Sequence, residues 1–137
     1  MTNRSPIQHR LPISLVNSPA LQQPLGHYSH LSVHSGLAFI SGQLPVDAGG
    51  RVLAGEPFTE QARQVLRNLD ACLAAVGADR SRLLQVTCYV TDISNWPAFD
   101  ALYREWIGDH RPARAVAGAS ELHYGSAIEI HAVCAAH

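Results

Sequence analysis

Residues 57–77 read PFTEQARQVLRNLDACLAAVG, and their pattern decides the fold class. Apolar residues recur here at intervals of three and four, which is the period of an α-helix with one buried face. Pro57 suits a first helical turn, and Gly77 suits the position after the last turn. The stretch therefore predicts a long amphipathic helix whose apolar face must pack against other elements.

A strand and a second helix are predicted after this helix. Apolar and polar residues alternate over residues 84–91, so this strand has one buried face. That face consists of Leu84, Val86, Cys88 and Val90. Residues 96–107 carry an apolar stripe at helical spacing, with Pro97 in the first turn and Gly108 after the end.

The remaining strands complete one sheet. They are residues 13–16, 28–34, 37–43, 114–119 and 127–135. A single α+β domain over residues 13–137, with a mixed sheet and two helices on one face, satisfies this order. Residues 1–12 have no usable period, and we predict a flexible N-terminal arm there. The second face of the sheet would expose apolar residues, which predicts self-association.

Lysine is absent from the 137 residues, so all ten basic side chains are Arg. This excludes a lysine Schiff base with a substrate or with pyridoxal phosphate, and it excludes a Walker-type phosphate loop. The formal net charge is -1, and the arginines are spread along the chain. A basic stripe for phosphate backbones is therefore missing, and we predict no nucleic-acid partner.

The cysteines and the N-terminal sequence bear on the cellular compartment. Cys72, Cys88 and Cys134 are odd in number and lie in apolar runs, which is typical of free thiols in a reducing compartment. The first sixteen residues lack the apolar core of a secretory signal, and no apolar run approaches membrane-spanning length. We predict a cytoplasmic protein with no membrane partner.

Arg114 and Glu129 lie fifteen residues apart, in two segments that we expect to be neighbouring strands. A guanidinium fork binds a planar anion through two hydrogen bonds, and a nearby carboxylate can deprotonate water. Alternation places His131 on the same strand face as Glu129. The pair suggests hydrolysis of a small acidic metabolite, and a cross-strand or intersubunit salt bridge is the alternative.

Several short motifs follow one another between Tyr28 and Ala135. They are Phe39-Ile40-Ser41-Gly42-Gln43-Leu44-Pro45, Glu60-Gln61-Ala62-Arg63-Gln64, Asn68-Leu69, Val86-Thr87, Tyr89-Val90-Thr91-Asp92, Pro112-Ala113-Arg114 and Ile128-Glu129-Ile130. Each motif is weak alone, but in this order they resemble the RidA/YjgF family of reactive imine and enamine deaminases, formerly labelled L-PSP endoribonucleases.

The resemblance implies a chorismate-mutase-like (ferredoxin-like) fold that assembles as a homotrimer with clefts between subunits. It implies hydrolysis of 2-imino or enamine acids, such as 2-iminopropanoate and 2-aminoacrylate, to 2-keto acids and ammonia, without a metal or organic cofactor. By position, Arg114 would bind the substrate carboxylate, and Glu129 would activate water and carry protons. Tyr28 and Ser41 would bind the substrate, although wall packing for Tyr28 and a backbone-capping role for Ser41 are alternatives.

The chain departs from the family pattern at three positions near the implied site. Asp100 stands where an Asn is often found, Val116 where some members carry Cys, and His131 where a second Glu is usual. An acidic Asp100 close to the site would repel an anionic substrate. We therefore expect Asp100 to face solvent or to mark a different substrate preference.

Three rival functions remain open from the sequence. A non-catalytic sensor of keto or amino acids would use Arg114 in the same clefts without needing Glu129 as a base. An endoribonuclease, an activity described for some relatives, would require a basic groove that this composition does not suggest. A zinc site at His27, His30 and His34 would lack a carboxylate or Cys ligand at suitable spacing.

Overall fold

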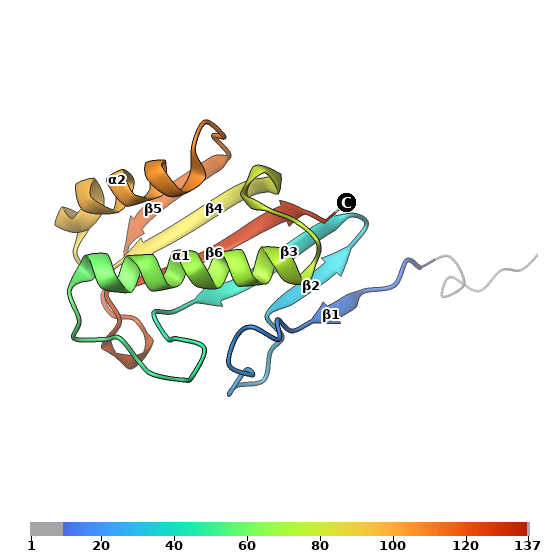
Figure 1. The fold of residues 1–137 in the computed structure, drawn as a ribbon, viewed down its shortest axis with the longest axis horizontal. Coiled ribbons are helices and arrows are strands. Elements are labelled where there is room, and N and C mark those ends of the chain that lie inside the picture. Colours follow the sequence, from blue (N-terminus) through green and yellow to red (C-terminus); the bar gives the residue numbers. More distant parts are fainter. Residues whose placement is uncertain (1–9, 137) are drawn as a thin grey trace, which may run out of the picture.

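Helix α1 (Phe58–Ala75) is the predicted amphipathic helix. In the computed structural model, which describes residues 10–136, it lies along one face of a six-stranded sheet (Figure 1). Pro57 precedes its first turn. After its last turn Gly77 takes a φ of 68°, which lets Gly77 and Ala78 donate hydrogen bonds to the final carbonyls of the helix. The helix therefore begins and ends where the sequence predicts.

Within the described residues, six strands form the sheet in the order β1-β2-β3-β6-β4-β5. They are β1 (Ser14–Val16), β2 (Leu31–His34), β3 (Leu37–Gln43), β4 (Leu83–Val90), β5 (Ala113–Gly118) and β6 (Ile128–Ala135). Only β4 and β5 run parallel, because α2 (Trp96–Ile107) connects them. Both helices cover the same face (Figure 1), so the predicted α+β domain with a mixed sheet is confirmed.

The strands that carry Arg114 and Glu129 are not neighbours, so this prediction was wrong. β4 lies between β5 and β6, because β5 follows a helical crossover and adds outside β4, whereas β6 inserts antiparallel between β3 and β4. Arg114 pairs with the buried Val86 on the helix side of the sheet, whereas Glu129 pairs with Tyr89 on the open side. Within one chain the two side chains point to opposite faces.

The core lies between the helices and the sheet. Side chains alternate along β6, and every second one is buried against the helices. Phe99 on α2 and Leu69 on α1 are fully buried there. Leu84, predicted on the apolar face of β4, is instead 47% exposed. The pairing of β4 with β6 shifts register between Leu83 and Gln85, and Leu83 takes the core position.

All three cysteines are free and buried, as predicted. They lie on α1, β4 and β6, within the core. Burial raises the pKa of Cys72 and of Cys88 to about 12, so both thiols stay protonated at neutral pH. They therefore act as small apolar side chains.

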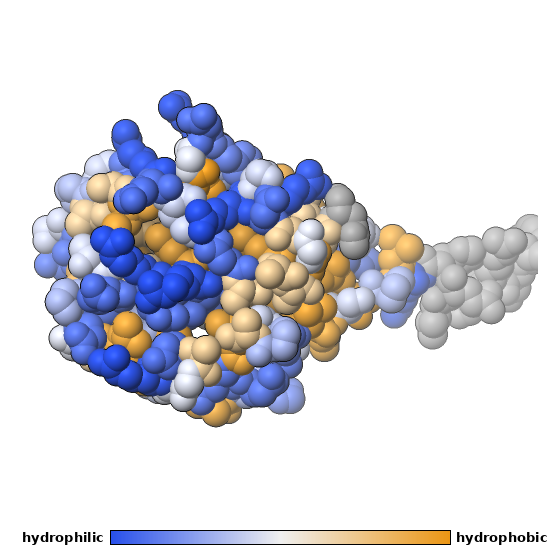
Figure 2. Space-filling view, viewed as in Figure 1, coloured by the Kyte–Doolittle hydropathy of each residue, from blue (hydrophilic) through white to orange (hydrophobic). Residues whose placement is uncertain are grey.

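The sheet face away from the helices is uncovered and partly apolar. The strand register places Leu15, Phe39 and Val133 in one row across β1, β3 and β6, and Leu15 and Phe39 are exposed. On the helix side, hydrophilic side chains spread over α1 and α2 (Figure 2). Neither of these described helices has the length and apolar character needed to cross a membrane.

Candidate active site

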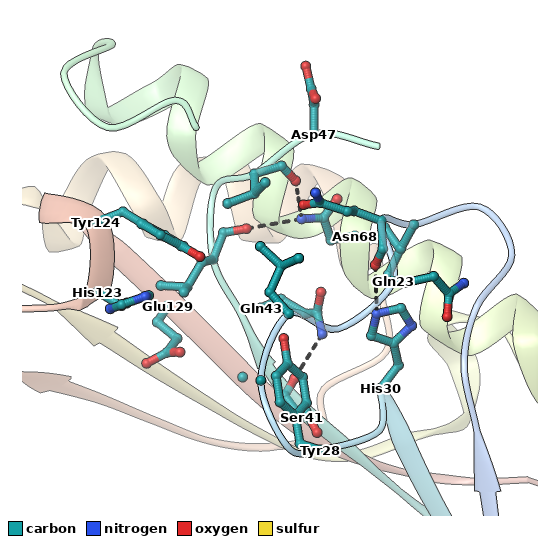
Figure 3. A pocket seen from close by; sticks show the side chains of 17 residues that line it. Gln23, Tyr28, His30, Ser41, Gln43, Asp47, Asn68, His123, Tyr124 and Glu129 are labelled. Atoms are coloured by element: carbon teal, nitrogen blue, oxygen red, sulfur yellow. Dashed lines mark hydrogen bonds between the residues drawn. The ribbon is translucent and has the colours of Figure 1, made fainter. Parts of the chain in front are cut away.

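A cavity of about 560 Å³ opens beside the start of β6 (Figure 3). Its walls come from residues 21–30, from residues 41–47, from the turn His123–Gly125, and from Asn68 on α1 and Glu129 on β6. The lining combines leucine and valine side chains with hydroxyl, amide and carboxylate groups. A cavity of this size and composition suits a small molecule that carries polar groups.

Glu129 enters the cavity because strand alternation points it away from the core, between the buried Ile128 and Ile130. Its carboxylate lies against Gly42 on β3, where a methyl group would come within 2.6 Å of Oε2. Among residues 10–136, no hydrogen bond or ion pair engages this carboxylate. The salt bridge with Arg114 that the sequence left open is absent within the chain, and Glu129 is available for chemistry.

Tyr28 reaches the cavity from the loop before β2 (Figure 3). Its side chain is half exposed. Burial, and then the neighbouring Tyr124 and Glu129, raise the pKa of Tyr28 above its ordinary value. The phenol is therefore neutral at physiological pH and can donate a hydrogen bond.

Ser41 lines the cavity, but its hydroxyl hydrogen is already donated to a backbone carbonyl. The hydroxyl donates to the carbonyl of Ser29 at 2.6 Å, and the Ser41 amide donates to the carbonyl of His30 at 2.9 Å. The backbone-capping role considered for Ser41 is thus present. The hydroxyl oxygen can still accept a hydrogen bond from a ligand.

Asn68 fixes a second wall and was not singled out as a site residue from the sequence. Its side-chain amide donates to the carbonyls of Leu44 and Val46, both at 3.0 Å. A signal was available, because Asn68 falls on the buried face of α1 beside Leu69. A polar residue on a buried helix face needs a partner, and here that partner is the cavity wall.

His30 organises the loop that carries Tyr28. Its Nδ1 accepts from the Ser18 amide at 2.9 Å, its Nε2 contacts the Gln22 carbonyl at 3.1 Å, and its own amide donates to Asn17 Oδ1 at 2.9 Å. Both ring nitrogens are therefore engaged by backbone groups, which fixes the neutral tautomer with hydrogen on Nε2. His30 is thus unsuited to the metal-ligand role considered from the sequence.

Protonation of His30 should destabilise the fold. Burial lowers the pKa of His30. The unfolded chain takes up this proton near pH 6.5, whereas the folded chain does so only at lower pH, so the free energy of unfolding falls as pH drops below about 6.5. Thermal melts between pH 8 and pH 5 should show this loss.

The matched variants are His30→Gln and, at an exposed position, His34→Gln. His30→Gln should cost about 1–3 kcal/mol at pH 8, because it disturbs buried hydrogen bonds, and it should flatten the pH dependence. His34→Gln should leave the free energy of unfolding at pH 8 and its pH dependence unchanged. Equal pH slopes in wild type and His30→Gln would contradict the assignment.

Arg114 lies outside this cavity, at the edge of the sheet formed by β5. Its Nη1 donates to Asp100 Oδ1 at 2.8 Å, and its guanidinium carbon lies 4.8 Å from the centre of the Tyr103 ring. Asp100 is only 9% exposed, so of the two alternatives expected for this acid, the one in which it faces solvent was wrong. Hydrogen bonds from Arg114 and Arg104 lower the pKa of Asp100. Asp100 is therefore ionised at neutral pH and forms ion pairs with both arginines.

The two other departures from the family pattern also lie outside the cavity. His131 Nε2 lies 3.3 Å from the Tyr89 hydroxyl, on the open face of the sheet. Val116 is partly buried and packs against the core on the helix side. Among residues 10–136, neither side chain makes a hydrogen bond or an ion pair with Glu129, and the partner of His131 is Tyr89.

Comparison with known proteins gives a consistent set of relatives. A family model described as "Endoribonuclease L-PSP" matches residues 18–136. A RutC family protein of Aquifex aeolicus is 33% identical over 121 residues, which cover 86% of this chain and 95% of the relative. A 2-iminobutanoate/2-iminopropanoate deaminase of Dermatophagoides farinae is 25% identical over 122 residues, covering 89% and 95%. The crystal structure of the Rid family protein YyfA of Yersinia pestis superposes with a TM-score of 0.87 at 26% identity, covering 90% of this chain and 99% of that one.

Proposed function

The chain belongs to the endoribonuclease L-PSP family, which is the RidA/YjgF family, and from this membership we propose that it hydrolyses 2-imino and enamine acids to 2-keto acids and ammonia. The observation that supports this most is the carboxylate of Glu129, which stands in a small-molecule cavity without an ion-pair partner among the described residues. The relative named as an imine deaminase supports the same chemistry.

In the proposed reaction, Glu129 takes a proton from water while the water oxygen attacks the carbon of the C=N bond. The substrate nitrogen is already protonated, so attack on this iminium carbon gives a neutral tetrahedral carbinolamine. Glu129 then transfers its proton to the nitrogen and takes up the hydroxyl proton as the C–N bond breaks, which forms the C=O of the 2-keto acid. The released ammonia finally takes this proton from Glu129 and leaves as ammonium. The neutral Tyr28 hydroxyl and the Ser41 oxygen hold the substrate or the water in the cavity. None of these steps calls for a metal or an organic cofactor.

The substrate carboxylate needs a cation, and Arg114 supplies it from a second subunit. Arg114 lies on the edge strand and on the other side of the sheet from Glu129, so it cannot close the cavity of its own chain. In a homotrimer with head-to-tail contacts, the edge formed by β5 and α2 of one subunit meets the cavity of the next. The exposed Leu15 and Phe39 on the uncovered face favour such an assembly.

One observation separates this proposal from a ribonuclease, and one measurement separates it from a sensor. A ribonuclease would need a basic groove, whereas among residues 10–136 the cavity of one chain is lined by Glu129 and Asp47 and by no Arg, and the proposed assembly adds only Arg114 of the next subunit. A non-catalytic sensor of keto or amino acids would use the same cavity and Arg114, and it differs in not accelerating hydrolysis. The three buried free thiols fit a reducing compartment, and we place the reaction in the cytoplasm.

The deciding experiment generates 2-iminopropanoate in situ from alanine with an amino-acid oxidase and follows its decay and the release of ammonia. We expect the protein to accelerate hydrolysis over buffer. Light scattering should give a mass of about three times the 14.8 kDa chain. Binding of pyruvate without any acceleration would favour the sensor, and a monomeric mass would contradict the assembly.

Gly42→Ala should impair hydrolysis without removing any catalytic group. The added methyl group would lie 2.6 Å from Glu129 Oε2 and 3.0 Å from Cδ, so the carboxylate must move. A displacement of this size predicts a fall in kcat of about 10- to 100-fold. The melting temperature should change little, because the flexible side chain of Glu129 can move away from the added methyl group.

Gly36→Ala is not a suitable control, since φ at Gly36 is 78°. Gly49→Ala, on the exposed loop, adds a methyl group whose nearest neighbour is Asp47 Oδ1 at 3.5 Å, and it should retain activity. Unimpaired kcat in Gly42→Ala would contradict the placement of Glu129 at the reaction centre.

A further inference from the structure

Asp100 is hydrogen-bonded to one of the three guanidinium nitrogens of Arg114. Asp100 Oδ1 accepts from Arg114 Nη1 and Oδ2 accepts from Arg104 Nε, both at 2.8 Å. Each carboxylate oxygen thus engages a different arginine. The Asp100 side chain is 13% exposed and that of Arg114 is 23% exposed, whereas that of Arg104 is 79% exposed. The contact with Arg114 is the better protected from solvent.

The remaining edge of the Arg114 guanidinium is free within residues 10–136. Neither Nε nor Nη2 has a hydrogen-bond partner there. These two nitrogens form the side-on fork that donates one hydrogen bond to each oxygen of a carboxylate. The Tyr103 ring, 5% exposed and 4.8 Å from the guanidinium carbon, supports the group at its face. The Asp100 contact therefore uses a nitrogen that a side-on carboxylate does not need.

The charges of this cluster also permit anion binding. Asp100 carries one negative charge, and Arg104 and Arg114 carry one positive charge each, so one net positive charge remains. The repulsion expected from an acid at position 100 is thus offset locally. A substrate with a single carboxylate meets a positive group whose orientation is already set.

We propose that Asp100 is a positioning residue, which holds Arg114 so that its Nε–Nη2 edge faces the carboxylate of the substrate. This inference rests on the proposed function and adds to it the group that prepares the anion site. A role limited to tying α2 to β5 would affect stability alone. A positioning role also changes KM, because a misplaced fork binds the carboxylate less well.

The test compares KM, kcat and melting temperature for 2-iminopropanoate hydrolysis in four variants. Asp100→Ala should raise KM about 10-fold and lower kcat by less. Asp100→Glu keeps the charge and the pairing but shifts the acceptor by one methylene, so it should fold and still raise KM several-fold. Asp100→Asn keeps an acceptor for Nη1 and should restore KM to the wild-type value or below. Asp109→Ala, at an exposed acid just beyond α2, should match wild type.

The outcomes separate this inference from the proposed function. Unchanged KM in both Asp100→Ala and Asp100→Glu, with at most a lower melting temperature, overturns the positioning role while hydrolysis by wild type stands. If Asp100→Ala does not fold, Asp100→Glu decides alone. A wild-type protein that does not accelerate hydrolysis overturns the proposed function, and this inference falls with it.

Discussion

Glu129→Gln should reduce kcat for imine hydrolysis by about 10²- to 10⁴-fold, the range expected when a positioned general acid–base group is lost. The amide has nearly the same shape as the carboxylate but cannot take a proton from water. Glu129 has no ion-pair partner among the described residues, so no buried charge is left uncompensated. The free energy of unfolding should therefore change by less than about 1 kcal/mol.

The measurement follows ammonia release from 2-iminopropanoate generated in situ. Glu121→Gln is the matched control, since Glu121 is exposed and lies outside the cavity. It should retain wild-type kcat. Pyruvate binding by Glu129→Gln should persist, because the carboxylate site is intact. If Glu129→Gln turns over at the wild-type rate, Glu129 is not the acid–base group, and the proposed deaminase mechanism is wrong.

Arg114→Ala should lower kcat/KM by about 10²- to 10⁴-fold, since two charge-assisted hydrogen bonds contribute roughly 1.5–3 kcal/mol each. Removal of Arg114 also leaves Asp100 with Arg104 alone, which costs stability. Arg114→Lys keeps a positive charge beside Asp100 but lacks the fork, so it should fold well and remain impaired. Arg111→Ala, at an exposed position before β5, should behave as wild type. Full activity in Arg114→Lys would contradict recognition by a fork.

Mixing the two inactive variants tests whether each site draws on two subunits. Arg114→Ala and Glu129→Gln subunits, unfolded together and refolded at equal amounts, should recover about a quarter of the native sites. Three of four random trimers are mixed, and each mixed trimer has one cleft of three with both residues intact. If Arg114 and Glu129 of the same chain formed each site, mixing the two variants would restore no hydrolytic activity.

The helices and strands were largely predictable because their signals are local. Residues 57–77 carry their own period and end signals, and the helix forms there. The order of the strands was not predictable, since β6 enters between β3 and β4 from the far end of the chain. Leu84 was misplaced for a similar reason, because a register shift in β4 depends on its partner.

The candidate site was predictable in part. Arg114 and Glu129 were selected from their side-chain chemistry, and Tyr28 and Ser41 were selected through the family resemblance. Tyr28, Ser41 and Glu129 line one cavity. The separation of Arg114 from Glu129 follows from strand order and could not be read from their spacing in the sequence. The pairing of Asp100 with Arg114 joins a helix to a strand, and no local pattern encodes it.

The placement of Arg114 and Glu129 on opposite sides of one sheet has a consequence for how activity depends on concentration. Under the proposed assembly a solitary chain carries both groups and still cannot react, so catalysis begins only when chains meet. Specific activity should then decline on dilution, in step with dissociation. Substitutions that only weaken the interface between subunits would therefore abolish activity, although every catalytic side chain is still present.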